Sequence, residues 1–216
     1  MAIVLDMDGV IVDSNPLHVK AWISYNRRLG IDTPEDLMER MYGRRNDEIV
    51  RDFFGPRLGA QEAVAHGAAK EALYREMLGP ELTARLVPGV REFLQRHAGE
   101  PVGLATNAEP ANVDFILQGA GLRPYFRVIV DGHQVLHAKP HPEIYLRAAE
   151  LLQVEPRNCI VFEDSFSGIR AARAAGTRIV GLRTTHQELP GVDLAIDNFL
   201  SPALQRWLSE QVPDAP

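Results

Sequence analysis

Short apolar segments alternate with helical patterns along most of this 216-residue chain. Consecutive parallel strands need a connection long enough for a helix, so the alternation predicts an α/β fold built on a parallel sheet. The expected strands cover residues 2–5, 102–105, 128–130, 159–162, 178–181 and 194–196. The expected helices cover about 88–98, 110–119, 141–153, 167–175 and 202–211, with Pro88 and Pro110 opening the first two.

The stretch from about residue 14 to residue 86 has a different pattern, with no convincing strand and a series of helical segments. Helices are expected at 15–29, 45–54 and 60–78, and Thr33 to Asp36 is typical of an N-cap followed by an acidic first turn. A helical insert directly after the first strand is expected to lie over the strand ends. We therefore predict an α/β core at 1–13 and 87–216, and a helical cap domain at 14–86.

Charge and cysteine content narrow the possible partners. The net charge of −6 disfavours a large nucleic-acid binding surface, because nucleic-acid phosphates are bound by clustered Lys and Arg. A small anionic substrate remains compatible with this charge, because a few local positive charges are enough to bind it. Cys159 is the only cysteine, so no intrachain disulfide forms. The apolar run at 2–5 stops at Asp6, and no stretch approaches the ~20 apolar residues of a membrane span. We expect a cytoplasmic protein, monomeric or a small homo-oligomer, without membrane or nucleic-acid partners.

Two aspartates follow the first expected strand, in the run from Asp6 through Asp8 and Gly9 to Val10. Side chains two residues apart share one side of a strand, and the carboxyl ends of parallel strands form the crevice where such sheets bind ligands. Two carboxylates so close repel each other, and a hard divalent cation is a natural counter-charge. The simpler alternative is a strand end followed by a turn, where Asp and Gly are common.

Polar residues also follow other expected strands. Thr106 and Asn107 end the second expected strand. Their hydroxyl and amide groups, together with free backbone N–H groups, can bind a phosphate. The alternative is that they only cap the following helix. Lys139 is one of three lysines in a chain with 20 arginines. The compact ammonium group of a lysine can contact both a phosphate and a carboxylate. The alternative is a solvated surface lysine, which is the commoner case. Glu163 and Asp164 end a further apolar strand, where helix capping is the alternative. Together, polar groups at one edge of the sheet are hard to explain by chance capping.

The order and spacing of these residues resemble the haloacid dehalogenase superfamily over nearly the full chain. Its four motifs are Asp-x-Asp-Gly-(Val/Thr), a strand-terminal Thr or Ser, a Lys usually before Pro, and an acidic pair after a strand. In this sequence they read Asp6-Met7-Asp8-Gly9-Val10, Thr106-Asn107, Lys139-Pro140 and Glu163-Asp164. The resemblance implies a Rossmann-like parallel sheet core with a helical cap domain inserted after the first strand.

The resemblance also implies a reaction. Asp6 attacks phosphorus and becomes an aspartyl-phosphate, which divides one difficult displacement into two easier ones. Asp8 protonates the leaving oxygen and then deprotonates the next nucleophile. Mg²⁺ is held by Asp6, the backbone carbonyl of Asp8 and Asp164, with Glu163 joining directly or through water.

The other two motifs are expected to bind the phosphate group. Thr106, Asn107 and Lys139 contact the phosphoryl oxygens, and Lys139 offsets the charge of the aspartates. In the dehalogenases and phosphonatases of the superfamily the second aspartate is replaced, because no alkoxide leaving group needs its proton. The presence of Asp8 therefore favours phosphate esters.

Within the superfamily, the run from Val10 to His18 followed by Ala21-Trp22 is similar to the β-phosphoglucomutase-like branch, which includes sugar-phosphate phosphatases. His18 matches a histidine near the cap hinge that helps couple closure to proton transfer; a surface histidine is the plain alternative. Two departures stand out. Glu109 occupies the place of a phosphate-holding lysine, and Asn46 occupies that of a cap arginine for a distal phosphate when the sequences are aligned on Gly43.

Arg44 and Arg45 lie beside Asn46 and are candidates to grip the polar end of a substrate, if they are not simply solvated. The loss of distal-phosphate contacts favours a Mg²⁺-dependent phosphatase that acts on a small phosphate monoester, such as a sugar phosphate. A β-phosphoglucomutase that uses the same nucleophile is the first alternative. A catalytically silent binding protein is the second, since fold alone does not fix function.

Overall fold

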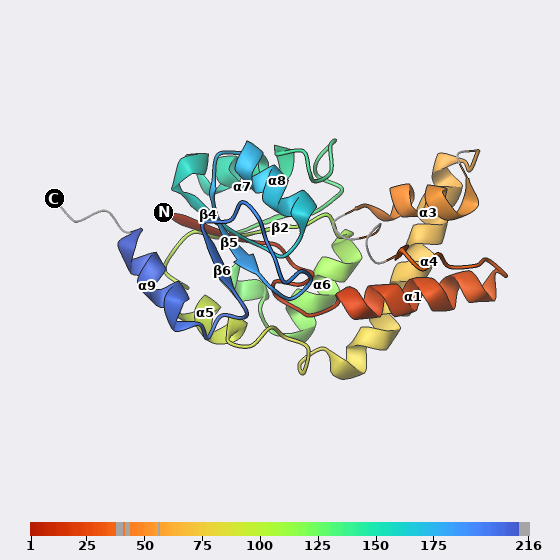
Figure 1. Cartoon of the computed structure of the whole chain (residues 1–216), viewed down its shortest axis with the longest axis horizontal. Coiled ribbons are helices and arrows are strands. Elements are labelled where there is room, and N and C mark those ends of the chain that lie inside the picture. The colour runs from red at the N-terminus through yellow and green to blue at the C-terminus, as the bar shows by residue number, and fades with distance from the viewer. Residues whose placement is uncertain (38–40, 42–43, 56, 212–216) are drawn as a thin grey trace.

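A six-stranded parallel sheet forms the centre of the protein (Figure 1). The computed structural model describes residues 1–37, 41, 44–55 and 57–211. The strand order is β3-β2-β1-β4-β5-β6. The strands are β1 (Ala2–Leu5), β2 (Val102–Ala105), β3 (Val128–Val130), β4 (Cys159–Glu163), β5 (Arg178–Leu182) and β6 (Leu194–Ile196). The predicted parallel α/β fold is confirmed, with β4 and β5 each extending one residue beyond the expected end.

Helices cover both faces of this sheet, which explains why its central strands are apolar except for Glu163 at the end of β4. The helices are α5 (Val90–Arg96), α6 (Pro110–Gly119), α7 (Glu143–Leu152), α8 (Phe166–Ala174) and α9 (Pro202–Glu210), with short 3₁₀ turns at Gly79–Glu81, Arg123–Tyr125 and Pro156–Asn158. Ile3 and Leu5 of β1 pack with apolar residues of α5, α6 and α9. Ala2 and Val4 point to the opposite face and pack with α7 and α8. Alternate residues of one strand therefore serve two separate cores.

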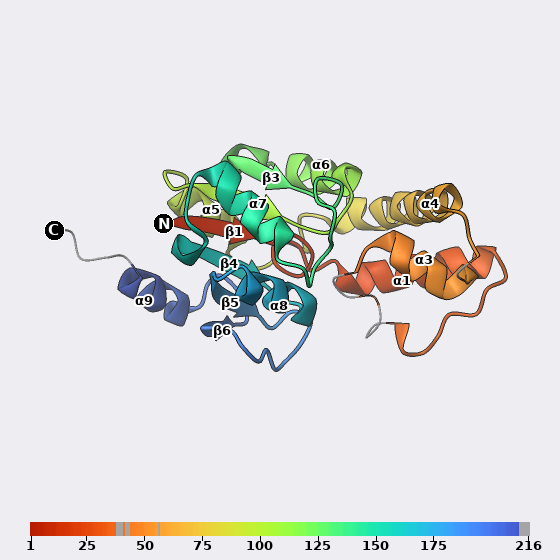
Figure 2. The same ribbon diagram turned by 90° about the horizontal axis from the view of Figure 1, so that it is seen from above.

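Three helices of the insert lie together beyond one end of the sheet, away from both termini (Figures 1 and 2). They are α1 (Asn15–Arg28), α3 (Asn46–Phe54) and α4 (Ala60–Leu78). The insert has an apolar cluster of its own that includes Trp22, Ile49 and Ala63. Among the described residues between 30 and 80 there is no strand, as the cap prediction requires. The exact domain boundaries at 13/14 and 86/87 stay a prediction.

Several helix ends differ from expectation. The helix expected to open with Pro88 begins at Val90, because Gly89 adopts a left-handed φ of 81° and the carbonyl of Pro88 instead accepts the N–H of Phe199. The other described helices differ from the predicted ranges by two residues or fewer at either end. The helix expected after Thr33–Asp36 falls mostly on residues 38–40 and 42–43, outside the described residues, as does Gly43. In the described part of the chain, no helix is long and apolar enough to cross a bilayer.

The turn after β1 brings the chain backbone against Asp164. Gly9 has a φ of 77°, a conformation that L-residues rarely adopt, and a Cβ at this position would overlap the carboxyl group of Asp164. The Gly9 N–H donates to the carbonyl of Val12 at 2.7 Å, which closes the turn. Glycine is therefore required here for both backbone conformation and space.

We expect Gly9→Ala to destabilise the protein by more than about 3 kcal/mol. The free-energy cost of a left-handed backbone conformation adds to the cost of the steric overlap with Asp164. Gly30→Ala is the matched control: Gly30 has a similar φ of 69°, but an added Cβ would meet no described neighbour within 4 Å. Strain alone should cost it roughly 1–2 kcal/mol. Urea unfolding of both variants measures the difference, and equal losses would contradict the close approach to Asp164.

Candidate active site

A cleft lies at the carboxyl ends of adjacent strands β2, β1 and β4, between the sheet and the insert. The sequence-predicted residues that line it are Asp6, Asp8, His18, Arg44, Asn46, Thr106, Asn107, Lys139 and Asp164. Three of these follow the strands directly: Asp6 after β1, Thr106 after β2 and Asp164 after β4. The topology thus gathers residues that are far apart in the chain at one edge of the sheet.

Lys139 is a buried cation that lines this cleft. Its Nζ donates to Asp6 Oδ1 at 2.7 Å, to Glu163 Oε1 at 2.7 Å and to the carbonyl of Ala105 at 3.0 Å. Burial alone would lower the pKa of Lys139, but the charges of Asp6 and Glu163 outweigh it and raise the pKa above its ordinary value. Lys139 therefore stays an ammonium ion.

Glu163 lies beneath the cleft, fully buried, and its lone pairs are all in use. Oε1 accepts from Lys139 and from the hydroxyl of Tyr145 at 2.6 Å. Oε2 accepts the N–H groups of Asp164 and Ser165, both at 3.1 Å, and the Ser165 hydroxyl at 3.0 Å. A carboxylate has about four acceptor sites, so little capacity is left for another ligand. A Cβ at Gly168 would overlap this carboxyl group, so the start of α8 sits directly on it.

Negative charge accumulates around Asp6. Carboxylate oxygens of Asp6, Glu163 and Asp164 lie within 4.8 Å of one another. Burial, followed by the neighbouring carboxylates, raises the pKa of Asp164 well above its ordinary value. Burial likewise raises the pKa of Asp6 to about 7, although Lys139 opposes the change. Three buried carboxylates against one ammonium leave the site short of positive charge, and a divalent cation with oxygen ligands fits that deficit.

Asp164 is fixed from two directions. Its Oδ2 accepts from Asn15 Nδ2 at 3.0 Å and from the Thr185 hydroxyl, and Asn15 also donates to Thr185 Oγ1 at 2.7 Å. Asn15 begins α1, whereas Thr185 follows β5. The first helix of the insert is therefore hydrogen-bonded directly to the acidic cluster.

Asp8 points to a different set of partners. Its Oδ1 accepts from Ser14 Oγ at 2.5 Å and from Tyr74 OH at 3.4 Å, and lies 3.2 Å from His18 Nε2. Burial would raise the pKa of Asp8, but the charge and hydrogen bonds of His18 and the bond from Ser14 together lower it. The His18 ring stacks on Tyr74 with centroids 3.8 Å apart, which fixes its orientation.

A buried polar network lies behind His18. Lys70 Nζ lies 2.9 Å from His18 Nδ1 and donates to Glu71 Oε1 at 2.6 Å. Glu71 also accepts from Asn46 Nδ2 at 2.6 Å and from Asn112 Nδ2 at 2.8 Å. Burial would raise the pKa of Glu71, yet Lys70 and His18 outweigh it and lower the pKa to about 2. The Asn46 amide, a predicted substrate contact, is thus hydrogen-bonded to a carboxylate.

Glu109 has a structural partner in the insert. Arg75 NH1 of α4 donates to Glu109 Oε1 and to Asn112 Oδ1, both at 2.6 Å. Glu109 is the N-cap residue of α6, and Asn112 lies in the first turn of that helix. Arg75 and Glu71 therefore connect α4 to the same end of α6. The acid that departs from the mutase pattern serves here as one side of an ion pair between insert and core.

The two candidate arginines have different positions. Arg44 lines the cleft, where its Nε donates to Glu48 at 3.2 Å and its NH1 to Asp52 at 2.8 Å. Arg45 does not line the cleft; its NH2 donates to the carbonyl of Val135 at 2.8 Å. Arg45 thus holds the insert to the loop that precedes Lys139.

Sequence reasoning missed several residues of the site. Lys70 had the same signal as Lys139, since both belong to a set of three lysines. Glu71 and Asn112 carry no local signal, because their importance comes from contacts between α4 and α6. Trp22 also lines the cleft, and its buried indole N–H has no acceptor within the described part of the chain. The other missed residues are Ser14, Asn15, Tyr145 and Thr185.

Glu71 should make stability depend on pH. Its pKa is about 2 against an ordinary 4.5, so its ionised form stabilises the fold by roughly 3 kcal/mol at neutral pH. Because the folded-state value is the lower one, this contribution is complete above about pH 5 and is lost as the pH falls towards 2. Glu71→Gln should therefore unfold much more easily than wild type at pH 7, and the gap should shrink by more than about half at pH 3.

Chemical denaturation at both pH values measures this gap, with Glu76→Gln, an exposed acid on the same helix, as the control. A gap that stays constant between pH 7 and pH 3 would contradict the assigned role of the Glu71 charge.

Comparison with known proteins agrees with this geometry. A family model for haloacid dehalogenase-like hydrolases matches residues 1–176. The fructose-1-phosphate phosphatase YqaB of Escherichia coli K12 is 33% identical over 84% of this chain and 95% of its own length. The β-phosphoglucomutase of Bacillus subtilis is 30% identical over 90% and 88% of the two chains. The crystal structure of β-phosphoglucomutase from Clostridium difficile, 27% identical, covers 97% of this chain and 96% of its own, with a TM-score of 0.84. The chain belongs to the haloacid dehalogenase-like hydrolases.

Proposed function

We propose that this enzyme is a Mg²⁺-dependent phosphatase that hydrolyses a small sugar phosphate through an aspartyl-phosphate on Asp6. The observation that carries the proposal is the contact of Asp6 with the buried ammonium of Lys139 at 2.7 Å, in a cleft that Asp8, Thr106 and Asp164 also line. A carboxylate held beside a fixed cation is oriented to attack an anionic phosphate that the same cation attracts. Relatives named as a fructose-1-phosphate phosphatase and as a β-phosphoglucomutase support a sugar-phosphate substrate.

The reaction has two displacements. Asp6 attacks phosphorus and forms the acyl-phosphate bond while the ester P–O bond breaks. Asp8, whose pKa is lowered in the structure, takes up a proton when the negative charge of the phosphate binds beside it, and gives that proton to the leaving sugar oxygen. Water then attacks phosphorus, Asp8 takes its proton, and Asp6 leaves as a free carboxylate. Thr106, Asn107 and Lys139 bind the phosphoryl oxygens in both steps.

The donor set around Asp6 fits Mg²⁺, which prefers oxygen ligands. Asp6, Asp164 and the backbone carbonyl of Asp8 would hold the ion, and when bound it offsets the charge of the phosphate and the carboxylates. We assign Glu163 to positioning rather than to direct coordination, because both its oxygens already accept hydrogen bonds from Lys139, Tyr145 and Ser165.

Phosphatase is favoured over mutase by the charge balance of the insert. The ammonium of Lys70 is paired with Glu71 at 2.6 Å, and Arg44 is paired with Glu48 and Asp52. A bisphosphate intermediate needs net positive charge around its second phosphate. Because these cations are paired with carboxylates, they contribute little net positive charge. Phosphomutase activity is the second candidate, because family members of that type share the fold and cover nearly the whole chain. A silent binding protein has no support from these relatives.

Replacement of the nucleophile tests the chemistry. Asp6→Asn should reduce the turnover of an aryl phosphate by a factor on the order of 10³ or more, because an amide does not form the acyl-phosphate. Asp114→Asn, at an exposed position on α6, is the control and should retain activity. A chelator in excess should stop the wild type, and restored turnover on addition of Mg²⁺ would complete the test. Full turnover in the chelator would rule out the metal site.

A panel of phosphorylated metabolites that includes β-glucose 1-phosphate tests substrate and reaction type. We expect free phosphate rather than glucose 6-phosphate.

Arg44→Ala should alter the ranking of sugar phosphates by several-fold in kcat/KM and spare a small aryl phosphate, because Arg44 lines the cleft. Arg45→Ala should shift all substrates together, since Arg45 holds the Lys139 loop. Formation of glucose 6-phosphate would favour the mutase, and an unchanged ranking in Arg44→Ala would remove it from the specificity site.

A further inference from the structure

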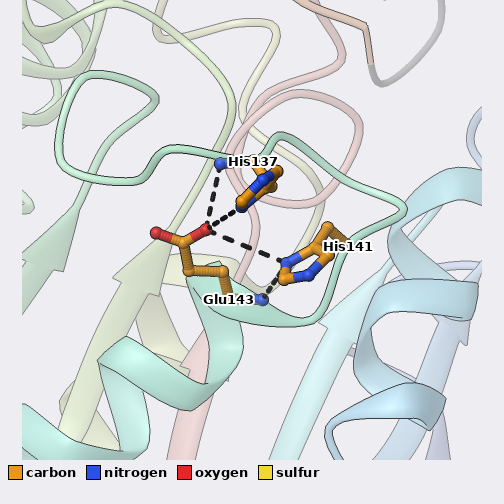
Figure 3. A group of neighbouring side chains, drawn as sticks. All are labelled: His137, His141 and Glu143. Carbon is orange, nitrogen blue, oxygen red and sulfur yellow. Dashed lines mark hydrogen bonds and ion pairs between the residues drawn. The ribbon is translucent and has the colours of Figure 1, made fainter.

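Two histidines and a glutamate converge on the segment that leads into α7 (Figure 3). Ligand atoms of His137, His141 and Glu143 lie within 4.8 Å of one another. Glu143 Oε2 is 2.9 Å from His137 Nδ1 and 3.8 Å from His141 Nδ1. The side chains of the two histidines are 62% and 50% exposed, and that of Glu143 is 29% exposed, so an ion in solvent can reach all three.

We propose that His137, His141 and Glu143 form a second metal site, which takes a borderline divalent transition-metal ion such as Zn²⁺. Imidazole nitrogens bind Zn²⁺, Co²⁺, Ni²⁺ and Cu²⁺, whereas Mg²⁺ prefers oxygen ligands. The donor set is therefore chemically different from the all-carboxylate cluster of the cleft. Three protein ligands leave a fourth tetrahedral position open to water.

The two separations from Glu143 are close to those that such an ion requires. Zn–N bonds of about 2.0–2.1 Å in a tetrahedron place neighbouring ligand atoms about 3.4 Å apart. The two separations of 2.9 and 3.8 Å from Glu143 Oε2 lie on either side of that value. A change of about 0.5 Å in each of these two separations would therefore bring it to the tetrahedral value.

Binding would replace a proton and one long backbone bond, because the Glu143 N–H donates to His141 Nδ1 at 3.3 Å. Glu143 Oε1 accepts the N–H of Leu136 at 2.8 Å, and Oε2 accepts the N–H of His137 at 3.0 Å as well as facing His137 Nδ1. The ion takes the position of the proton between Oε2 and Nδ1 of His137, and that proton leaves to solvent. The two backbone bonds to the Glu143 carboxylate stay, whereas a His141 Nδ1 that binds the ion gives up the N–H of Glu143. The bond from Leu136, followed by those from His137, lowers the pKa of Glu143 to about 2, so the ligand is already a carboxylate.

The loop that carries the site is held by contacts that need no ion. Arg45 donates to the carbonyl of Val135, and Asn107 Oδ1 accepts the N–H of Lys139 at 3.3 Å. The buried ammonium of Lys139, between the two histidines in sequence, is bonded to Asp6. A loop fixed at these points presents its ligands in place, which lowers the ordering cost of binding.

Titration of the full-length protein with Co²⁺ in saturating Mg²⁺ tests the proposal, since Co²⁺ bound to imidazole absorbs visible light and Mg²⁺ keeps the carboxylate cluster occupied. We expect one saturable Co²⁺ spectrum. His137→Gln and His141→Gln should each weaken Co²⁺ binding at least about tenfold. Mutation of a residue that only hydrogen-bonds a metal ligand already lowers metal affinity by about that factor. His133→Gln removes an exposed histidine from the same region and should leave binding unchanged. Asp164→Asn should also leave it unchanged, which separates this site from the cleft.

Three results would overturn the proposal. One is the absence of a Co²⁺ spectrum in the wild type, and another is its loss in Asp164→Asn. The third is unchanged Co²⁺ binding in His137→Gln and His141→Gln, whether or not thermal stability falls; the three side chains would then only fasten the loop.

Discussion

The structure around the cleft depends on one buried ammonium ion. Lys139 bonds Asp6 and Glu163, each at 2.7 Å, and so connects the loop before α7 to the ends of β1 and β4. Removal of one partner from such a buried set leaves an uncompensated charge, which typically costs about 3–5 kcal/mol. The same ammonium places a positive charge where an anionic phosphate would meet Asp6. In the proposed function, stability of the site and attraction of the phosphate would therefore come from the same contact.

The insert is attached to the core through an ion pair and hydrogen bonds as well as through apolar packing. Arg75 bonds Glu109, and Glu71 bonds Asn112, so two residues of α4 meet the start of α6. Arg45 makes a further bond to the loop of Lys139. Any movement of the insert relative to the sheet has to exchange these bonds for bonds to water or substrate.

The sheet and the residues at its edge were predictable because they follow local patterns. Buried strands such as β1 are apolar runs. Asp6 and Thr106 come directly after such runs, and Asp164 follows Glu163 at the end of another. Residues whose surroundings come from distant segments were not predictable. Glu109 differed from the mutase pattern, but only the structure places Arg75 against it. Likewise, nothing local distinguishes Arg44, which lines the cleft, from Arg45, which bonds the loop.

The central claim is that Asp6 carries the phosphoryl group between the two displacements. Borohydride added to acid-quenched reaction mixtures reduces an aspartyl-phosphate to homoserine. Peptide mass spectrometry then locates the homoserine in the sequence. Homoserine is expected at position 6, and only when substrate and Mg²⁺ have both been added. Intact Asp6 in samples quenched during rapid turnover, or homoserine at Asp8 instead, would contradict it.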